Sequence, residues 1–146
     1  MGSLDSTVEG FQGVNVMTRN IACAIAGAVL SLASSALLAQ TAGPAKVGDT
    51  SVGKVLVDAK GMTLYTLDRD TTPSKSTCNG QCATNWPPLM VSGDGKDAGE
   101  WTVVTRDDGG KQWAYKGKPL YFWKDDKKPG DVEGDNRNNV WHVAKP

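Results

Sequence analysis

GKPLYFWKDD, residues 117–126, has an earlier copy in GMTLYTLDRD, residues 61–70, at an offset of 56 residues. Four positions are identical in the two copies: Gly61 and Gly117, Leu64 and Leu120, Tyr65 and Tyr121, and Asp70 and Asp126. A repeat with a period of about fifty residues predicts two related supersecondary units, neither of which buries its apolar face alone. The repeat therefore predicts architecture, and it says nothing about chemistry.

The aspartate that ends each copy lies five residues beyond the tyrosine, roughly 16 Å along an extended strand. Tyr65 and Asp70 therefore cannot touch within one copy, and the same holds for Tyr121 and Asp126. We expect each aspartate to lie just past its strand, where it accepts backbone N–H groups in a turn or a hydrogen bond from elsewhere in the fold. We also expect the two tyrosines to occupy equivalent places in two hairpin-like units related by a rough two-fold axis.

Residues 1–39 are predicted to be a leader with a signal peptide, and Met17 is the expected natural start. A short basic segment at 17–20 precedes an uncharged apolar run at 21–38 that ends in small residues. This order is typical of a secretory signal peptide, with cleavage expected after Ala39 or, alternatively, after Ala36 or Ala42. A retained membrane anchor is the other interpretation, since an apolar run of about 18 residues just spans a bilayer. Contact with a membrane is expected only through the uncleaved leader.

Charge and cysteine content narrow the class of protein. The chain has 16 Lys and Arg against 16 Asp and Glu and carries no basic patch, so no nucleic-acid partner is expected. Cys23 lies within the leader, which leaves Cys78 and Cys82 as a pair that is expected to oxidise in an exported domain. Cysteines four residues apart lie within disulfide reach on successive turns of a short helix. The expected location is the periplasm or the extracellular medium.

The rest of the chain reads as short strands and polar loops. Residues 40–49 are small and polar and are predicted to be a flexible lead-in to a folded domain at 50–146. Strands are expected at 53–58 and 62–67 as a first hairpin, at 101–106 and 111–116 as a second hairpin, and at 140–143. No long segment has helical periodicity. The fold class is therefore predicted to be all-β, a small single domain of two related β-hairpin units with one short helix or turn at the cysteine pair.

Two acidic loops, at 92–99 and 127–139, invite comparison with calcium-binding loops. Neither loop has the oxygen spacing of such a site, and the second lacks both the glycine at the sixth position and the closing glutamate. Solvated loops are the preferred interpretation, and no metal site and no cofactor are predicted.

The motif residues resemble a bacterial family known only as the secreted repeat of unknown function, whose members are often lipoproteins with a Tyr-x-(Phe/Trp/Tyr)-x-x-Asp motif. Tyr121, Trp123 and Asp126 fit that motif. Residues that fit the middle segment of the family are Cys78, Cys82, Trp86, Pro87 and Pro88. The resemblance covers about residues 50–146. It departs at Leu67, where the first copy would have an aromatic residue, and no lipidation cysteine follows the leader, which suggests a soluble member. The resemblance implies an exported envelope protein without an assigned activity.

A non-catalytic exported domain is the preferred class of function, because the tryptophans and tyrosines all lie between Tyr65 and Trp141. Aromatic side chains fill small cores, and they also stack on flat partners such as sugars and peptides. Possible binding residues are Trp86, Trp113, Trp141 and His142. The partner would be an envelope component or a small ligand.

Two other classes of function stay open. A periplasmic redox or copper-handling protein would use soft ligands of the kind that copper(I) prefers: Cys78, Cys82, His142, Met62 and Met90. An enzyme with paired carboxylates would use the Asp107–Asp108 or Asp125–Asp126 pair. Neighbours on a strand point to opposite faces, so neither pair is expected to converge on a substrate.

Overall fold

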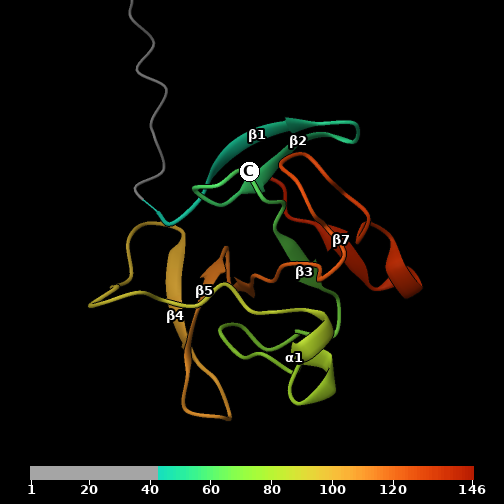
Figure 1. Cartoon of the computed structure of the whole chain (residues 1–146). Coiled ribbons are helices and arrows are strands. Elements are labelled where there is room, and N and C mark those ends of the chain that lie inside the picture. The colour runs from blue at the N-terminus through green and yellow to red at the C-terminus, as the bar shows by residue number, and fades with distance from the viewer. Residues whose placement is uncertain (1–42) are drawn as a thin grey trace, which may run out of the picture. The chain divides into compact units, whose positions relative to one another are not determined.

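The computed structural model describes residues 43–146 (Figure 1), so the predictions for the leader, the cleavage site and the start at Met17 lie outside the described residues. The described part contains seven short strands, one α-helix and one 3-10 helix. In chain order they are β1 (Lys46–Thr50), β2 (Gly53–Val57), β3 (Tyr65–Leu67), α1 (Gln81–Asn85), β4 (Trp101–Thr105), β5 (Lys111–Tyr115), β6 (Lys118–Pro119), η1 (Arg137–Asn139) and β7 (Trp141–Val143).

All strand pairs are antiparallel and form three small sheets, with orders β1-β2, β3-β7 and β4-β5-β6. Figure 1 shows the β1–β2 and β4–β5 hairpins as separate arms and β3 beside β7. The predicted all-β class is confirmed, as are the second hairpin and the closing strand, which is β7. The short helix forms at the cysteine pair, as expected.

The first hairpin differs from the prediction. Lys46–Thr50 is already a strand, so the fold begins earlier than residue 50 and the second half of the expected lead-in is structured. β2 pairs along its whole length with β1, whereas Thr63 makes only an isolated bridge to β2 and β3 pairs with β7. The tight turn between β1 and β2 is possible because Gly53 has a positive φ of 96° and the Thr50 hydroxyl bonds its carbonyl at 2.8 Å.

The backbone follows the same course twice, in a first unit (residues 46–91) and a second unit (residues 101–145). In each unit a hairpin is followed by a leucine that returns to it: Leu64 N–H bonds Leu56 O at 2.9 Å, and Leu120 N–H bonds Trp113 O at 3.0 Å. The units meet at the two motif tyrosines, whose backbones exchange hydrogen bonds of 2.8 and 3.0 Å. Tyr65 and Tyr121 thus lie opposite each other on an approximate two-fold axis.

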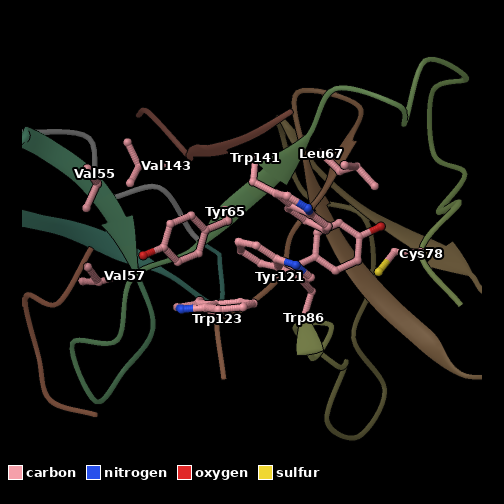
Figure 2. Close-up of a cluster of buried hydrophobic side chains, with 10 residues drawn as sticks. All are labelled: Val55, Val57, Tyr65, Leu67, Cys78, Trp86, Tyr121, Trp123, Trp141 and Val143. Atoms are coloured by element: carbon pink, nitrogen blue, oxygen red, sulfur yellow. The ribbon is translucent and has the colours of Figure 1, made fainter. Parts of the chain in front are cut away.

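Side-chain alternation along the strands produces two cores. Tyr65 and Tyr121 point into one core, and the preceding Leu64 and Leu120 point into the other. The first core is drawn in Figure 2 and consists of Val55, Val57, Tyr65, Leu67, Cys78, Trp86, Tyr121, Trp123, Trp141 and Val143. The second consists of Ala45, Leu56, Leu64, Leu89, Trp101, Tyr115, Leu120 and Ala144. Both faces of the central strands are therefore buried.

Stacked tryptophans from the two units fill the centre of the first core. Trp86 and Trp141 lie parallel with ring centroids 3.8 Å apart, and each meets the tyrosine of its own unit edge-on, at 5.5 Å for Tyr65 and 5.2 Å for Tyr121. Figure 2 shows these rings gathered with Trp123, which lies 4.4 Å from Trp86. The edge-on contacts of the two tyrosines add to the stabilisation from burial.

Candidate functional site

The motif tyrosines and aspartates are exchanged between the two units. The Tyr65 hydroxyl donates to Asp126 Oδ2 at 2.6 Å, and the Tyr121 hydroxyl donates to Asp70 Oδ2 at 2.6 Å. All four side chains are buried. Each aspartate therefore receives its hydrogen bond from the opposite unit, which explains how a tyrosine and an aspartate that cannot touch within one copy are both used.

Each aspartate also holds a turn in its own unit. Asp70 Oδ1 accepts the backbone N–H of Thr77 at 2.8 Å, and Asp126 Oδ1 accepts that of Glu133 at 3.0 Å. Both acceptors therefore bind a backbone N–H seven residues further along the chain. The Thr77 hydroxyl adds a third hydrogen bond to Asp70, at 2.7 Å. The motif thus links turn formation within a unit to docking between units.

This environment changes the acidity of three of these groups. Burial raises the pKa of Tyr65 and of Tyr121 far above the ordinary range, and the hydrogen bond to a carboxylate raises the pKa of each hydroxyl further. Burial also raises the pKa of Asp126, while the hydrogen bonds from Tyr65 and from the Glu133 N–H lower it. The tyrosine hydroxyls therefore stay protonated in the folded protein and keep donating to the two carboxylates.

Alkaline pH is expected to unfold the protein through these tyrosines. A folded-state pKa above the unfolded value of about 10 gives stability that is fully present below pH 10 and is lost as pH rises above it. The two groups together should remove about 2.7 kcal/mol of unfolding free energy per pH unit above that point. Urea denaturation between pH 9 and pH 11 measures this slope.

The double variant Tyr65→Phe, Tyr121→Phe is the control for that experiment. Lysine titration affects both proteins alike, so the difference between their slopes isolates the two tyrosines. Equal slopes in the two proteins would contradict the assigned titration.

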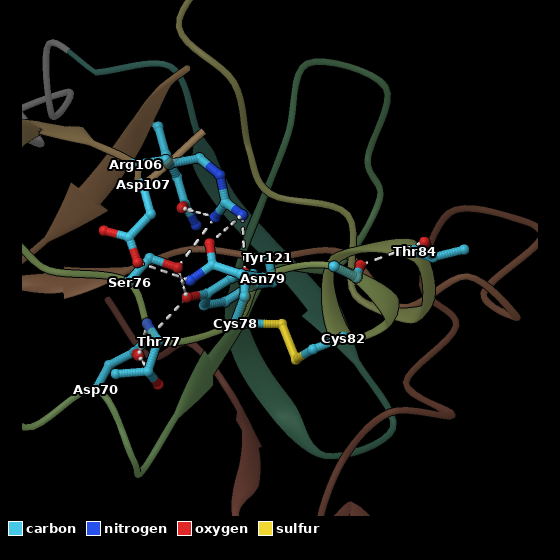
Figure 3. The surroundings of a disulfide bond; sticks show 12 residues. Asp70, Ser76, Thr77, Cys78, Asn79, Cys82, Thr84, Arg106, Asp107 and Tyr121 are labelled. Atoms are coloured by element: carbon cyan, nitrogen blue, oxygen red, sulfur yellow. Dashed lines mark hydrogen bonds between the residues drawn. A yellow bond between two sulfur atoms is a disulfide. The ribbon is translucent and has the colours of Figure 1, made fainter. Parts of the chain in front are cut away.

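The cysteine pair forms the predicted disulfide, Cys78–Cys82, with a Cα–Cα distance of 5.2 Å. Figure 3 shows the bridge joining α1 to the segment before it, beside Arg106 and Tyr121.

Replacing both cysteines with serine is expected to lower the free energy of unfolding by about 2 kcal/mol or less, because the bridge closes only a small ring. Thermal denaturation of the Cys78→Ser, Cys82→Ser variant checks this, and failure of that variant to fold would show that the bridge does more than hold α1.

Arg106 is a buried cation that the sequence analysis did not single out. Its guanidinium donates to Gln112 Oε1 at 2.7 Å, to Cys78 O at 2.8 Å and to Ser76 Oγ at 3.0 Å. The Ser76 hydroxyl in turn forms a hydrogen bond of 2.7 Å with the Tyr121 hydroxyl (Figure 3). Arg106 therefore ties the disulfide segment of the first unit to the β4–β5 hairpin of the second.

The possible binding residues are placed in different surroundings. Trp86 and Trp141 are buried at 5% and 4% exposure and stack on each other, so they contribute to the core and not to an exposed aromatic surface. His142 is half-buried and pairs with Asp68 Oδ2 at 3.0 Å. Trp113 is half-buried and lines a pocket. The residues are therefore not brought together in one binding surface.

The soft ligands of the copper hypothesis lie on separate elements. Both cysteine sulfurs are used in the disulfide. Met62 follows β2, Met90 bridges to β5, and His142 lies in β7. Residues 43–146 hold no cluster of three or more histidine, cysteine or acidic side chains that could bind a metal ion.

The carboxylate pairs of the enzyme hypothesis also separate. Asp126 is buried against Tyr65, whereas Asp125 is exposed and binds Lys124 at 2.9 Å. Asp108 pairs with Arg106 Nε at 3.3 Å, and its pKa is lowered by the Gly110 N–H and by this arginine. Neither pair converges on a common point.

One pocket combines an aromatic wall with polar groups. It has a volume of about 450 Å³ and is lined by Gly43, Pro44, Asp58, Ala59, Leu89, Met90, Ser92 and Trp113. We call it the Trp113 pocket. It lies where the first unit's turn after β2 meets the second unit's β5, so side chains from both units form it.

The paired hairpins, the tyrosine–aspartate exchange and the disulfide define a small β domain built from two copies of one unit. A family model described as "Secreted repeat of unknown function" matches residues 46–90 and 102–145. The chain belongs to this family, which confirms the resemblance seen in the motif, and it is an exported domain whose role the family description leaves open. No curated protein and no solved structure matches the chain. Within residues 43–146, helices are too short and too polar to cross a bilayer.

Proposed function

We propose that the protein is a non-catalytic binding domain of the cell envelope, periplasmic or secreted, which holds a neutral sugar ring in the Trp113 pocket. The observation that supports this proposal is the lining of the pocket, where the apolar residues Trp113 and Met90 accompany the polar residues Asp58 and Ser92. An aromatic ring packs on the apolar face of a flat ligand, and the carboxylate accepts hydrogen bonds from its hydroxyls. The volume of the pocket is in the range of small-molecule sites.

The pocket is present at one of two equivalent places in the repeat. Asp58 occupies the position that Tyr115 occupies in the second unit, because Leu56 and Trp113, two residues earlier, make equivalent hydrogen bonds to Leu64 and Leu120. The Tyr115 ring is buried and packs on Trp101 with centroids 4.8 Å apart. The first unit therefore has an aspartate, followed by the small Ala59, where an aromatic ring is packed in the second, and both residues line the pocket.

The charge of the lining favours a neutral ligand over an anionic one. Asp58 is the ionisable residue among those that line the pocket. Its Oδ1 accepts the N–H groups of Lys60 and Met62, both at 2.9 Å. Lys46 donates to the carbonyl oxygen of Ala59 at 3.4 Å and is not a lining residue. A phosphate or carboxylate ligand would meet a like charge without a cation to compensate it.

Titration calorimetry against a panel of neutral mono- and disaccharides, with their uronic-acid analogues as the anionic arm, tests the proposal. The wild type should bind a neutral sugar, and Ala59→Tyr should weaken that binding at least about tenfold, or 1.4 kcal/mol, because the new ring fills the pocket. Ser51→Tyr places the same ring in the exposed turn between β1 and β2 and is the matched control. Binding that Ala59→Tyr leaves unchanged, or a panel without a binder, would overturn the proposed function.

A further inference from the structure

The two units complete each other's sheets. After α1 the chain leaves the first unit and pairs with the second, where Leu89 N–H bonds Leu120 O at 2.9 Å and Trp113 N–H bonds Leu89 O at 2.8 Å. At the C-terminus the chain returns to the first unit, where Leu56 N–H bonds Ala144 O at 2.8 Å and Ala144 N–H bonds Leu64 O at 2.8 Å. The last segment of each unit thus pairs with the other unit, through equivalent backbone hydrogen bonds.

The contacts between side chains follow the same exchange. Three side-chain contacts each join one unit to the other. They are the hydrogen bonds from Tyr65 to Asp126 and from Tyr121 to Asp70, and the stacking of Trp86 on Trp141. A unit without its partner would expose this apolar surface and leave its buried polar groups without their hydrogen bonds. The surface that one unit presents therefore fits the other unit, whichever chain supplies it.

The covalent connection between the units is a single loop, residues 92–100, which we call the linker. The linker contains three glycines, is exposed except at Gly95, and has Gly93 and Gly99 at positive φ. Its nine residues span about 30 Å when extended. The hydrogen bonds and stacking that join the units come from residues outside it, so they do not depend on whether the two units share one chain.

We propose that the partner this protein fits is a second copy of itself, through exchange of units: the first unit of each chain docks on the second unit of the other, with the linker as the hinge. Both halves of the dimer then contain every contact of the closed monomer, and exchange of identical elements is a low-cost route to a dimer. A short flexible linker gives the two units of one chain a millimolar effective concentration, so the closed monomer predominates when the protein is dilute.

Complementation between two damaged chains tests the exchange. Leu67 and Trp123 occupy equivalent positions of the two copies and are both buried. Leu67→Asp damages only the first unit and Trp123→Asp only the second, and each variant alone is expected to lack the near-ultraviolet circular dichroism of the fold because a charge is buried. Refolded together, the intact first unit of one and the intact second unit of the other should restore about half of the native signal, since one of two possible pairings is undamaged.

Mixing Leu67→Asp with Leu56→Asp is the control, because both substitutions damage the first unit and no undamaged pair can form. Native mass spectrometry of the first mixture should show one labelled and one unlabelled chain in the folded species. Should either damaged variant fold alone, labelled and unlabelled wild type refolded together at high concentration should give mixed dimers. A complementary mixture without native signal, or wild type that refolds only to monomers, would overturn the exchange.

Discussion

Replacing Asp70 with alanine is expected to lower the free energy of unfolding by about 4 kcal/mol, because three hydrogen bonds to a buried carboxylate are lost together. Asp70 is 3% exposed and accepts from the Tyr121 hydroxyl and from both the N–H and the hydroxyl of Thr77. Hydrogen bonds to a charged group contribute about 1.5–3 kcal/mol each, and the Tyr121 hydroxyl left behind is buried, whereas Thr77 is exposed and its donors can bond water. Urea denaturation at pH 7 measures the loss.

Asp68→Ala is the matched control, since Asp68 lies in the same loop, is exposed and forms an ion pair only with the half-buried His142 in the described residues. A surface ion pair of this kind contributes about 0–1 kcal/mol. Asp126→Ala should cost about 3 kcal/mol, because Asp126 accepts two hydrogen bonds in place of three. If Asp70→Ala proved no more destabilising than Asp68→Ala, the exchanged pairs would not stabilise the fold.

The motif predicted most of the architecture, because the number of residues between its tyrosine and its aspartate limits which groups can touch. Five extended residues separate Tyr65 from Asp70, so the sequence predicted that the aspartate finds its donor elsewhere in the fold. It did not say that the donor is the equivalent tyrosine of the other copy, since contact between residues distant in sequence depends on how the two units dock. The expected turn at each aspartate and the expected bond from elsewhere both occur, on different oxygens of the same carboxylate.

The local sequence pattern predicted structure less well where a segment owes its conformation to contacts with distant residues. Lys46–Thr50 contains a glycine and an aspartate, which are poor strand formers, and it becomes a strand because β2 pairs with it and Gly48 lets Val57 approach closely. Among the candidate binding residues, the sequence could not separate the buried Trp86 and Trp141 from the half-buried Trp113, because aromatic residues suit a core and a binding surface equally.

The two hairpins differ at one further pair of equivalent positions, Asp58 and Tyr115. A short polar residue in one unit and a large aromatic residue in the other indicate that the two units pack differently there. The sequence alone gives no reason to treat this difference as a pocket, because the other walls come from the second unit and from residues 89–92. The candidate site is thus a property of how the two units meet.

Arg106 was missed because its neighbours in sequence are those of a solvated turn, Asp107 and Asp108. Its equivalent in the first unit, Thr50, is half-buried and its hydroxyl bonds only within its own turn, so comparison of the two copies does not predict a buried guanidinium. The arginine is 3% exposed, and three of its acceptors are uncharged oxygens of Ser76, Cys78 and Gln112. Its contribution is therefore expected to come from hydrogen bonds that join the units more than from an ion pair.

Arg106→Met should consequently lower the free energy of unfolding by about 3–4 kcal/mol, since methionine keeps the apolar stem but leaves the buried acceptors of Gln112 and Cys78 unmatched. The exposed Arg69→Met is the control for loss of one positive charge. In the double variant Arg106→Met, Gln112→Met, the loss should be less than the sum of the single losses, because the orphaned amide oxygen is gone as well. Urea denaturation of the four proteins closes this cycle, and strict additivity of the two substitutions would show that the guanidinium does not act through Gln112.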